Sequence, residues 1–168
     1  LSSLAGLEQL ASVTGSVVIS SNAALTSLTG LTGLTTINKI PLDGTLGHLN
    51  IDNNPILGSV FGLANLTSVG GNLQVTSNGI GNLNGLGQVA AIGGNVVVQY
   101  NNSLTNMSSF IGAINTVGGD VNFYGNTSLS ECSVSAFVAS LSAYTGTTTN
   151  QYNVACTTPN ACSGAVCM

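Results

Sequence analysis

The stretch that decides the fold is LTSVGGNLQVTSNG, residues 66–79, because the chain repeats it with small changes. VAAIGGNVVVQYNN follows at residues 89–102, and NTVGGDVNFYGN at residues 115–126. Each copy has an apolar residue before a Gly-Gly step, an alternation of apolar and polar residues after it, and an Asn near its end. Self-similarity at a period of about 20–50 residues is the sequence signature of a repeat architecture.

Aligned on this pattern, the chain divides into five units and a tail. The units begin at Leu1, Leu25, Leu57, Ile80 and Leu104, and the tail begins at Leu129. Successive starts therefore lie 24, 32, 23, 24 and 25 residues apart. We assign residues 1–128 to a repeat region, and residues 129–168 to a cysteine-containing cap of the same domain.

The second half of each unit predicts a β-strand, because side chains two residues apart share one face. Its inward positions are Val17 and Ile19, Leu49 and Ile51, Leu73 and Val75, Val96 and Val98, and Val121 and Phe123. Stacked in register, such units make parallel sheets around one core that no single unit could bury alone.

The first half of each unit has apolar residues three positions apart, as in Leu28, Leu31 and Leu34. This spacing is too short for a regular α-helix, and we expect short strands and corners there. We expect the Gly-Gly step to supply the positive φ of a corner. The expected fold class is all-β, a parallel solenoid of about five coils of 23–32 residues with a disulfide-stapled C-terminal cap.

An Asn closes every unit, and we expect these side chains to form a structural ladder. Stacked Asn side chains can hydrogen-bond to one another and to the exposed backbone of a corner. The ladder residues are Asn22, Asn54, Asn78, Asn101 and Asn126.

The composition excludes several classes of partner. Lys39 is the only basic residue among 168, against five acidic residues, which gives a net charge of −4. Such a chain offers no attraction to nucleic acid or to anionic lipid. No apolar run approaches the ~20 residues needed to span a bilayer, so we expect no membrane insertion.

The cysteines indicate an oxidising compartment, and hence a secreted or cell-surface protein. All four lie in the tail, and their spacing does not fit a zinc site, so two disulfides are the better interpretation. Pairing Cys132 with Cys156 and Cys162 with Cys167 is one of three possible connectivities.

The phrases LTSLTGLTGLTTI, GNLQVTSN and GGNVVVQYNNSLTNM resemble the receptor L-domain-like repeat, a relative of leucine-rich repeats in receptor ectodomains and microbial surface proteins. The resemblance covers residue 1 to about residue 129. It implies a right-handed parallel β-helix, export or attachment to the cell surface, and no enzymatic activity. The tail, with Val134, Phe137, Val138 and Leu141 at helical spacing, resembles a short capping helix.

Candidate chemistry in the sequence is sparse, and we expect no catalytic, cofactor or metal site. The long second unit brings Lys39, Asp43 and His48 together, and Asp43, His48 and Asp52 could formally bind a metal ion. However, His48 aligns with a position that is polar in every unit, which favours a solvated residue at the start of a strand.

Four Asn-x-Ser/Thr sequons occur, at Asn65, Asn101, Asn106 and Asn126. Asn101 and Asn126 belong to the ladder, whereas Asn65 and Asn106 align with outward polar positions. In a eukaryotic source, Asn65 and Asn106 are therefore the glycosylation candidates.

Three functions remain open. A self-assembling structural protein is favoured, because Leu4, Leu7 and Leu10 face whatever lies beneath the first coil, and docking of a second copy head to tail would cover them. The alternative is an adhesive module that binds glycans or surface proteins, with Tyr100 and Tyr124 as its one modest aromatic cluster. An ice- or carbohydrate-binding solenoid ranks last, because the outward rows are mixed.

Overall fold

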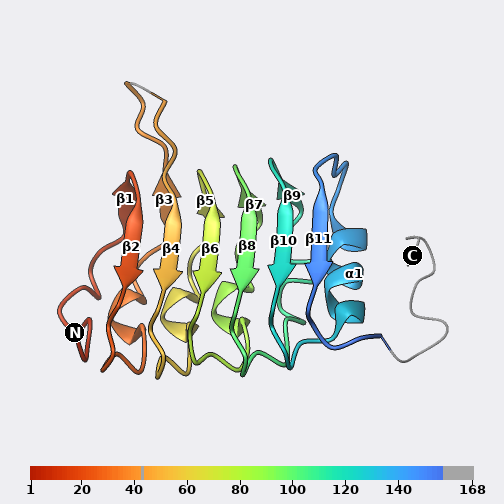
Figure 1. The fold of residues 1–168 in the computed structure, drawn as a ribbon. Coiled ribbons are helices and arrows are strands. Elements are labelled where there is room, and N and C mark those ends of the chain that lie inside the picture. The colour runs from red at the N-terminus through yellow and green to blue at the C-terminus, as the bar shows by residue number, and fades with distance from the viewer. Residues whose placement is uncertain (43, 157–168) are drawn as a thin grey trace.

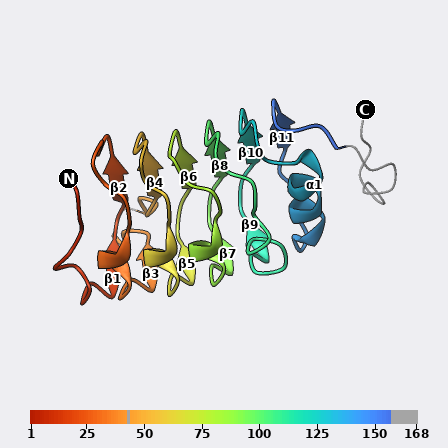
Figure 2. The same cartoon turned by 90° about the horizontal axis from the view of Figure 1, so that it is seen from below.

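The computed structural model describes residues 1–42 and 44–156. Two parallel sheets run along the molecule, and each of the first five layers contributes one strand to each sheet (Figure 1). The larger sheet has the order β11-β10-β8-β6-β4-β2 and the smaller one β1-β3-β5-β7-β9. Figure 2 shows the two sheets as opposite walls of a stack.

Every strand is short and pairs in register with the same position of the next layer. The larger sheet consists of β2 (Val17–Ser20), β4 (Leu49–Asp52), β6 (Leu73–Thr76), β8 (Val96–Gln99), β10 (Val121–Tyr124) and β11 (Thr148–Gln151). The smaller sheet consists of β1 (Ser12–Thr14), β3 (Thr36–Asn38), β5 (Ser68–Val69), β7 (Ala91–Ile92) and β9 (Thr116–Val117).

One apolar core fills the space between the sheets. Leu73, Val75, Val96 and Val98 are all fully buried, as alternation along a strand with one inward face requires. Ile19 is buried as well, and Val17 is partly buried in the first layer. The predicted inward faces of β4, β6, β8 and β10 are thus the inward faces of the structure.

The prediction of an all-β, right-handed parallel β-helix is wrong. The two parallel sheets are combined with an α-helix and three 3-10 helices, as in an α/β-like parallel-sheet fold. The 3-10 helices are η1 (Thr29–Leu31), η2 (Phe61–Leu63) and η3 (Asn84–Leu86).

The reason lies in the three-residue spacing. Leu31 N donates to Leu28 O at 2.9 Å, and Leu34 N donates to Leu31 O at 3.0 Å. A 3-10 helix has three residues per turn, so residues three apart lie above one another on one side. The spacing that suggested strands and corners instead keeps Leu28, Leu31 and Leu34 pointing into the core through tight helical turns.

The Gly-Gly steps are also explained differently. Gly70, Gly93 and Gly118 do not have positive φ. A Cβ atom on Gly93 would lie 2.4 Å from Gly70 O, and one on Gly118 would lie 2.4 Å from Gly93 O. These glycines allow the backbones of neighbouring layers to approach closely. A positive φ occurs at this corner in the first layer, at Gly15 with a φ of 102°, and the other end of the larger sheet's strands has one in every layer.

The tail adds a sixth layer to the stack. β11 pairs with β10, and α1 (Glu131–Ser140) lies at the C-terminal end of the molecule (Figure 1). Val134 and Phe137 of α1 are buried against the core. Cys132 and Cys156 form a disulfide, which confirms this predicted pair. Cys162 and Cys167 lie outside the described residues.

Across the described residues, no helix has the length and apolar character needed to cross a bilayer.

Candidate binding surface

The corner after each strand of the larger sheet is built around the Asn ladder. Asn78 N donates to Asn101 Oδ1 at 3.0 Å, and Asn78 Nδ2 donates to Ile51 O and Thr76 O at 2.9 Å. Asn78 Oδ1 in turn accepts from the backbone and side-chain nitrogens of Asn54. A buried side-chain amide that makes all of its hydrogen bonds stabilises the folded state, whereas an unpaired one lowers the free energy of unfolding.

The same pattern joins the other layers. Asn22 donates to Asn54 Oδ1, Asn101 donates to Asn126 Oδ1, and Asn126 donates to Asn153 Oδ1. Asn54, Asn101 and Asn126 are fully buried. Asn153, which the five-unit alignment left in the cap, thus extends the ladder into the sixth layer.

A second ladder runs along the starts of the same strands, and we call it the strand-start ladder. In each layer a side-chain acceptor binds the backbone N–H of the aligned residue in the next layer. Its members are Ser16, His48, Asn72, Asn95, Asp120 and Thr147.

His48 has a structural role in this ladder. Its Nδ1 accepts from Asn72 N at 2.8 Å, as Asn72 Oδ1 accepts from Asn95 N at 2.9 Å. A hollow of about 240 Å³ lies beside it, lined by residues of β2, β4 and β6 and by the ladder residue before each of these strands. The described residues contain no group of three His, Cys, Asp or Glu that could hold a metal ion, and Asp43 lies outside them.

Between the strands and the Asn ladder, one position per layer has left-handed backbone geometry. It is occupied by Ser21, Asn53, Ser77, Tyr100, Gly125 and Tyr152, with φ between 54° and 68°. Gly and Asn tolerate this region, whereas a bulky residue there is a conformational outlier. Two of the six layers nevertheless carry tyrosine.

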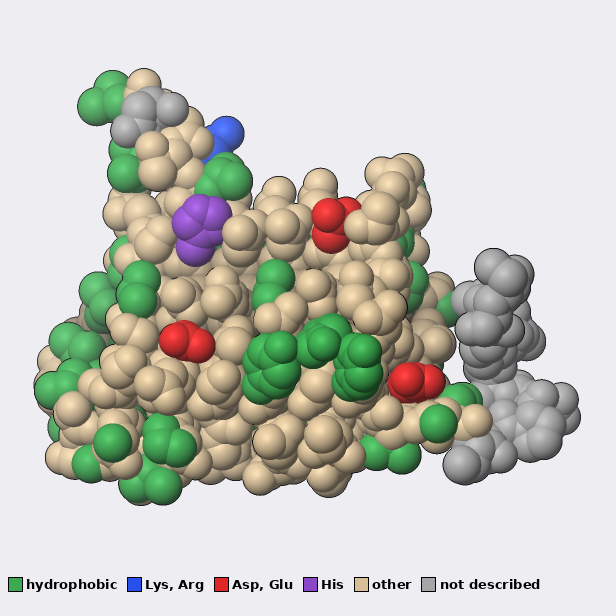
Figure 3. Space-filling model, viewed as in Figure 1, with side chains coloured by type: hydrophobic (Ala, Val, Ile, Leu, Met, Phe, Trp, Pro, Cys, Tyr) green, Lys and Arg blue, Asp and Glu red, His purple; other side chains and the backbone are tan. Residues whose placement is uncertain are grey.

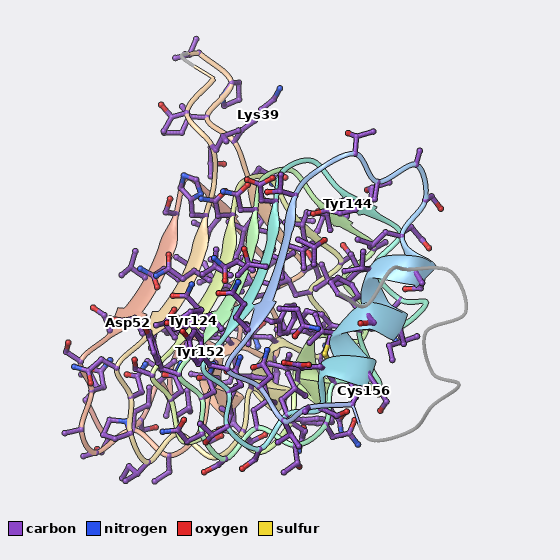
Figure 4. The ribbon with its side chains drawn as sticks, turned by 45° about the vertical axis from the view of Figure 1, so that its right-hand side comes forward. Lys39, Asp52, Tyr124, Tyr144, Tyr152 and Cys156 are labelled. Atoms are coloured by element: carbon purple, nitrogen blue, oxygen red, sulfur yellow. A yellow bond between two sulfur atoms is a disulfide. The ribbon has the colours of Figure 1, made fainter. Side chains whose placement is uncertain are left out.

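These two residues and Tyr124 of β10 form what we call the tyrosine cluster. The ring of Tyr124 packs edge to face against Tyr100, with centroids 5.5 Å apart, and against Tyr152, with centroids 4.9 Å apart. Tyr100 is 51% exposed and Tyr152 is 68% exposed. Figure 4 shows Tyr124 and Tyr152 together on the outer side of the larger sheet.

Gly125 makes room for the cluster. A Cβ atom at this position would lie 2.9 Å from Tyr100 Cδ1, so the ring of Tyr100 lies over the glycine. Partial burial beneath its neighbours raises the pKa of the Tyr124 hydroxyl, and the nearby hydroxyls of Tyr100 and Tyr152 raise it further. In Figure 3 this face is mostly polar, and hydrophobic side chains gather on it toward the C-terminal strands.

No family model, curated protein or solved structure matches the chain. The resemblance to the receptor L-domain-like repeat therefore stays a prediction.

The other predicted residues lie apart from the tyrosine cluster. Leu4 and Leu10 pack partly buried against the core, and Leu7 is 44% exposed in the first layer. Asn65 and Asn106 are exposed. Asn65 Nδ2 donates to Thr32 O at 2.7 Å, whereas Asn106 Oδ1 accepts from Ser108 N.

Sequence reasoning missed Tyr152 because it treated the tail as a cap. The signal was present, since QYN at residues 151–153 repeats QYN at residues 99–101. Read as a sixth unit, the tail would have placed Tyr152 in the same column as Tyr100.

Proposed function

We propose that the chain is a non-enzymatic, extracellular binding module whose ligand site is the tyrosine cluster. The observation that carries this proposal is tyrosine at two left-handed corners. Bulky residues in sparsely populated backbone regions cost about 1–3 kcal/mol each, and such residues concentrate at functional sites. Ser, Asn or Gly fills the same corner in the other four layers, so the fold does not need an aromatic ring there.

The compartment is supported by the covalent structure. The Cys132–Cys156 disulfide is compatible with a secreted or cell-surface protein, because thiols in the cytosol are kept reduced. The resemblance to surface-protein repeats points the same way. Aromatic side chains that are exposed together are typical anchors of binding surfaces.

Tyrosine fluorescence tests the proposal directly. The chain has no Trp and four Tyr, so three of its four emitting side chains belong to the cluster. Screening of the full chain against glycan and peptide panels should yield a ligand that changes this emission saturably. The double variant Tyr100→Ser/Tyr152→Ser should lose the binding, and the proposal fails if every ligand found binds the variant equally well.

The double variant should fold, because serine already occupies the same corner at positions 21 and 77. Phe61→Ser is the matched control. Phe61 is an aromatic residue that is 62% exposed, and it belongs to η2 and not to the larger sheet.

Self-assembly into a fibre or surface layer is a second candidate function, favoured by the first layer. Within residues 1–42 and 44–156, β1 and β2 each have a paired strand on one side only, and Leu1 is 75% exposed at the same end. Exposed strand edges of this kind can pair with another chain. The chain has few charged side chains, so electrostatic repulsion between two copies is weak.

Light scattering over a concentration series tests this second function. We expect the apparent mass to rise with concentration, and Leu7→Asp to suppress the rise. Leu42→Asp is the control, because Leu42 is 99% exposed on the loop between β3 and β4. A constant monomeric mass, or equal behaviour of the two variants, would rule out assembly through the first layer.

A further inference from the structure

We infer that the ligand of the tyrosine cluster is a neutral carbohydrate chain that lies along the stack, across the strands of the larger sheet. This inference rests on the proposed function and adds the chemical class of the ligand. It follows from three properties of the outer face: its charge, its hydrogen-bonding groups and the arrangement of its rings.

The charge of the face favours an uncharged ligand. Lys39, the only Lys or Arg of the chain, lies on the projecting loop away from Tyr124 and Tyr152 (Figure 4). An anionic ligand would therefore find no cation at the cluster. In the row of outward residues that contains Tyr124, Asp52 is the one carboxylate, and it lies three strands away on β4.

The outward rows of the face are mixed in residue type, but most of their members carry hydrogen-bonding groups. Because the strands pair in register, outward side chains line up in two rows with a spacing of about 4.8 Å between layers. One row is Val18, Asn50, Gln74, Val97, Asn122 and Thr149, and the other is Ser20, Asp52, Thr76, Gln99, Tyr124 and Gln151. Amides and hydroxyls both donate and accept, which suits a ligand with hydroxyl groups around its rim.

Part of this hydrogen-bonding capacity is unused. In the part of the chain that the structure describes, Asn50 Oδ1, Thr76 Oγ1 and Asn122 Oδ1 are covered by their neighbours and have no hydrogen-bond partner. All three belong to the two outward rows, and Asn122 lies two residues before Tyr124 on the same face of β10. An unpartnered buried polar atom costs free energy, and a side-chain rotation that exposes it to a polyhydroxyl ligand would supply the missing partner.

The rings supply the apolar part of the site. A sugar ring presents polarised C–H groups on its faces, and an aromatic ring has a negative face that attracts them. Tyr100, Tyr124 and Tyr152 come from three successive layers, so the cluster extends along the stack and not along one strand. A ligand chain of several sugar units in this direction would contact the rings, Gln99 in the layer of Tyr100, and Thr76 in the next layer.

Titration of the full chain with defined probes tests this inference. The probes are neutral hexasaccharides of the cello, chito, laminari and manno series, a hexamer of galacturonic acid, and a ten-residue proline peptide. We expect at least one neutral hexasaccharide to change the tyrosine emission saturably. The dissociation constant should be nearly unchanged from about 0.05 to about 0.5 M salt, because no charges are paired.

The variants locate the site. Tyr100→Ser and Tyr152→Ser should each raise the dissociation constant of the hexasaccharide at least about tenfold, as truncation of an aromatic anchor does. Phe61→Ser should leave it unchanged. The matching disaccharide should bind at least about tenfold more weakly, because it cannot reach all three rings.

The outcomes separate the inference from the proposed function. If only the proline peptide or the anionic hexamer binds, and the tyrosine variants abolish that binding, the carbohydrate assignment is overturned and the binding module stands. If no probe binds, or binding survives in both tyrosine variants, the carbohydrate assignment and the proposed site are both overturned.

Discussion

Gly93 and Gly118 carry no side chain because the preceding layer occupies the space where a Cβ atom would lie. We expect Gly93→Ala to lower the free energy of unfolding by about 2 kcal/mol or more, since backbone atoms at 2.4 Å cannot give way as a flexible side chain can. Chemical denaturation measures this change.

Gly58→Ala is the control for this substitution. A Cβ atom there meets nothing within 4 Å, and the backbone has no positive φ. The change should be neutral or slightly stabilising, because alanine restricts the unfolded chain. Equal destabilisation by both variants would show that close approach between layers is not the reason for the Gly-Gly steps.

The Asn ladder gives a second local prediction. Asn78→Ala removes the acceptor of Asn54 N and the donor to Ile51 O, and it leaves buried backbone groups unpaired. We expect a loss of about 1–3 kcal/mol in the free energy of unfolding. The exposed Asn102, which accepts from the Thr127 hydroxyl, is the comparison. If Asn78→Ala and Asn102→Ala had the same denaturation midpoint, the ladder would contribute nothing.

We expect the attachment of β11 to depend on pH through Asp120. Its Oδ1 accepts from Thr147 N at 2.8 Å, and this backbone hydrogen bond holds the pKa of the carboxyl below its usual value of 3.8. Because the pKa of Asp120 is lower in the folded state, the ionised carboxylate stabilises the fold at pH values above 3.8. This stabilisation is lost as the pH falls through the folded-state pKa and the carboxylate becomes protonated. Thr147 should therefore lose amide-exchange protection in acid.

Asp120→Asn separates this titration from general acid effects. Asn occupies the same place in the strand-start ladder at positions 72 and 95, so the variant keeps an acceptor for Thr147 N and has no charge to lose. We expect its Thr147 amide to show little additional exchange between pH 5 and pH 2, apart from the intrinsic chemical dependence. An identical acid response in both proteins would mean that Asp120 does not control the attachment of β11.

The elements show which parts of the sequence pattern were informative. Strict alternation of apolar and polar residues identified the strands and their inward faces, because only a β-strand puts every second side chain on the same side. The three-residue spacing was ambiguous between a corner and a 3-10 turn, and Leu28, Leu31 and Leu34 could be assigned only from their backbone hydrogen bonds. β11 was missed because Thr148 and Asn150, which pair with the inward residues Val121 and Phe123 of β10, are polar.

The tyrosine cluster could be predicted only in part. Tyr100 and Tyr124 were visible as neighbours one layer apart, but a sequence does not show that one of them has a positive φ. The role of Gly125 was hidden for the same reason, since its space is filled by a ring from another layer. Contacts between layers decide both features.

Across the whole molecule, the four sequons divide by accessibility. Expressed through a eukaryotic secretory pathway, the chain should carry glycans on Asn106 first and on Asn65 second. Asn65 must first release its hydrogen bond to Thr32 O, and Asn101 and Asn126 are fully buried. Mass analysis after enzymatic deglycosylation locates the sugars, and glycans confined to Asn101 and Asn126 would contradict the assignment of outward and inward columns.

The projecting loop between β3 and β4 has a consequence for how the protein can change (Figure 1). Val17 pairs with Leu49 across 32 residues, and Leu49 pairs with Leu73 across 24, yet both pairs keep the same register. At the base of the loop, Ile40 N donates to Thr45 O at 2.7 Å, and this hydrogen bond holds the two ends of the loop together beside the sheets. Residues can thus be inserted between β3 and β4 without disturbing the pairing of the layers. A foreign epitope can be grafted at this loop for the same reason. Insertions of this kind are also a way in which a repeat protein can diversify.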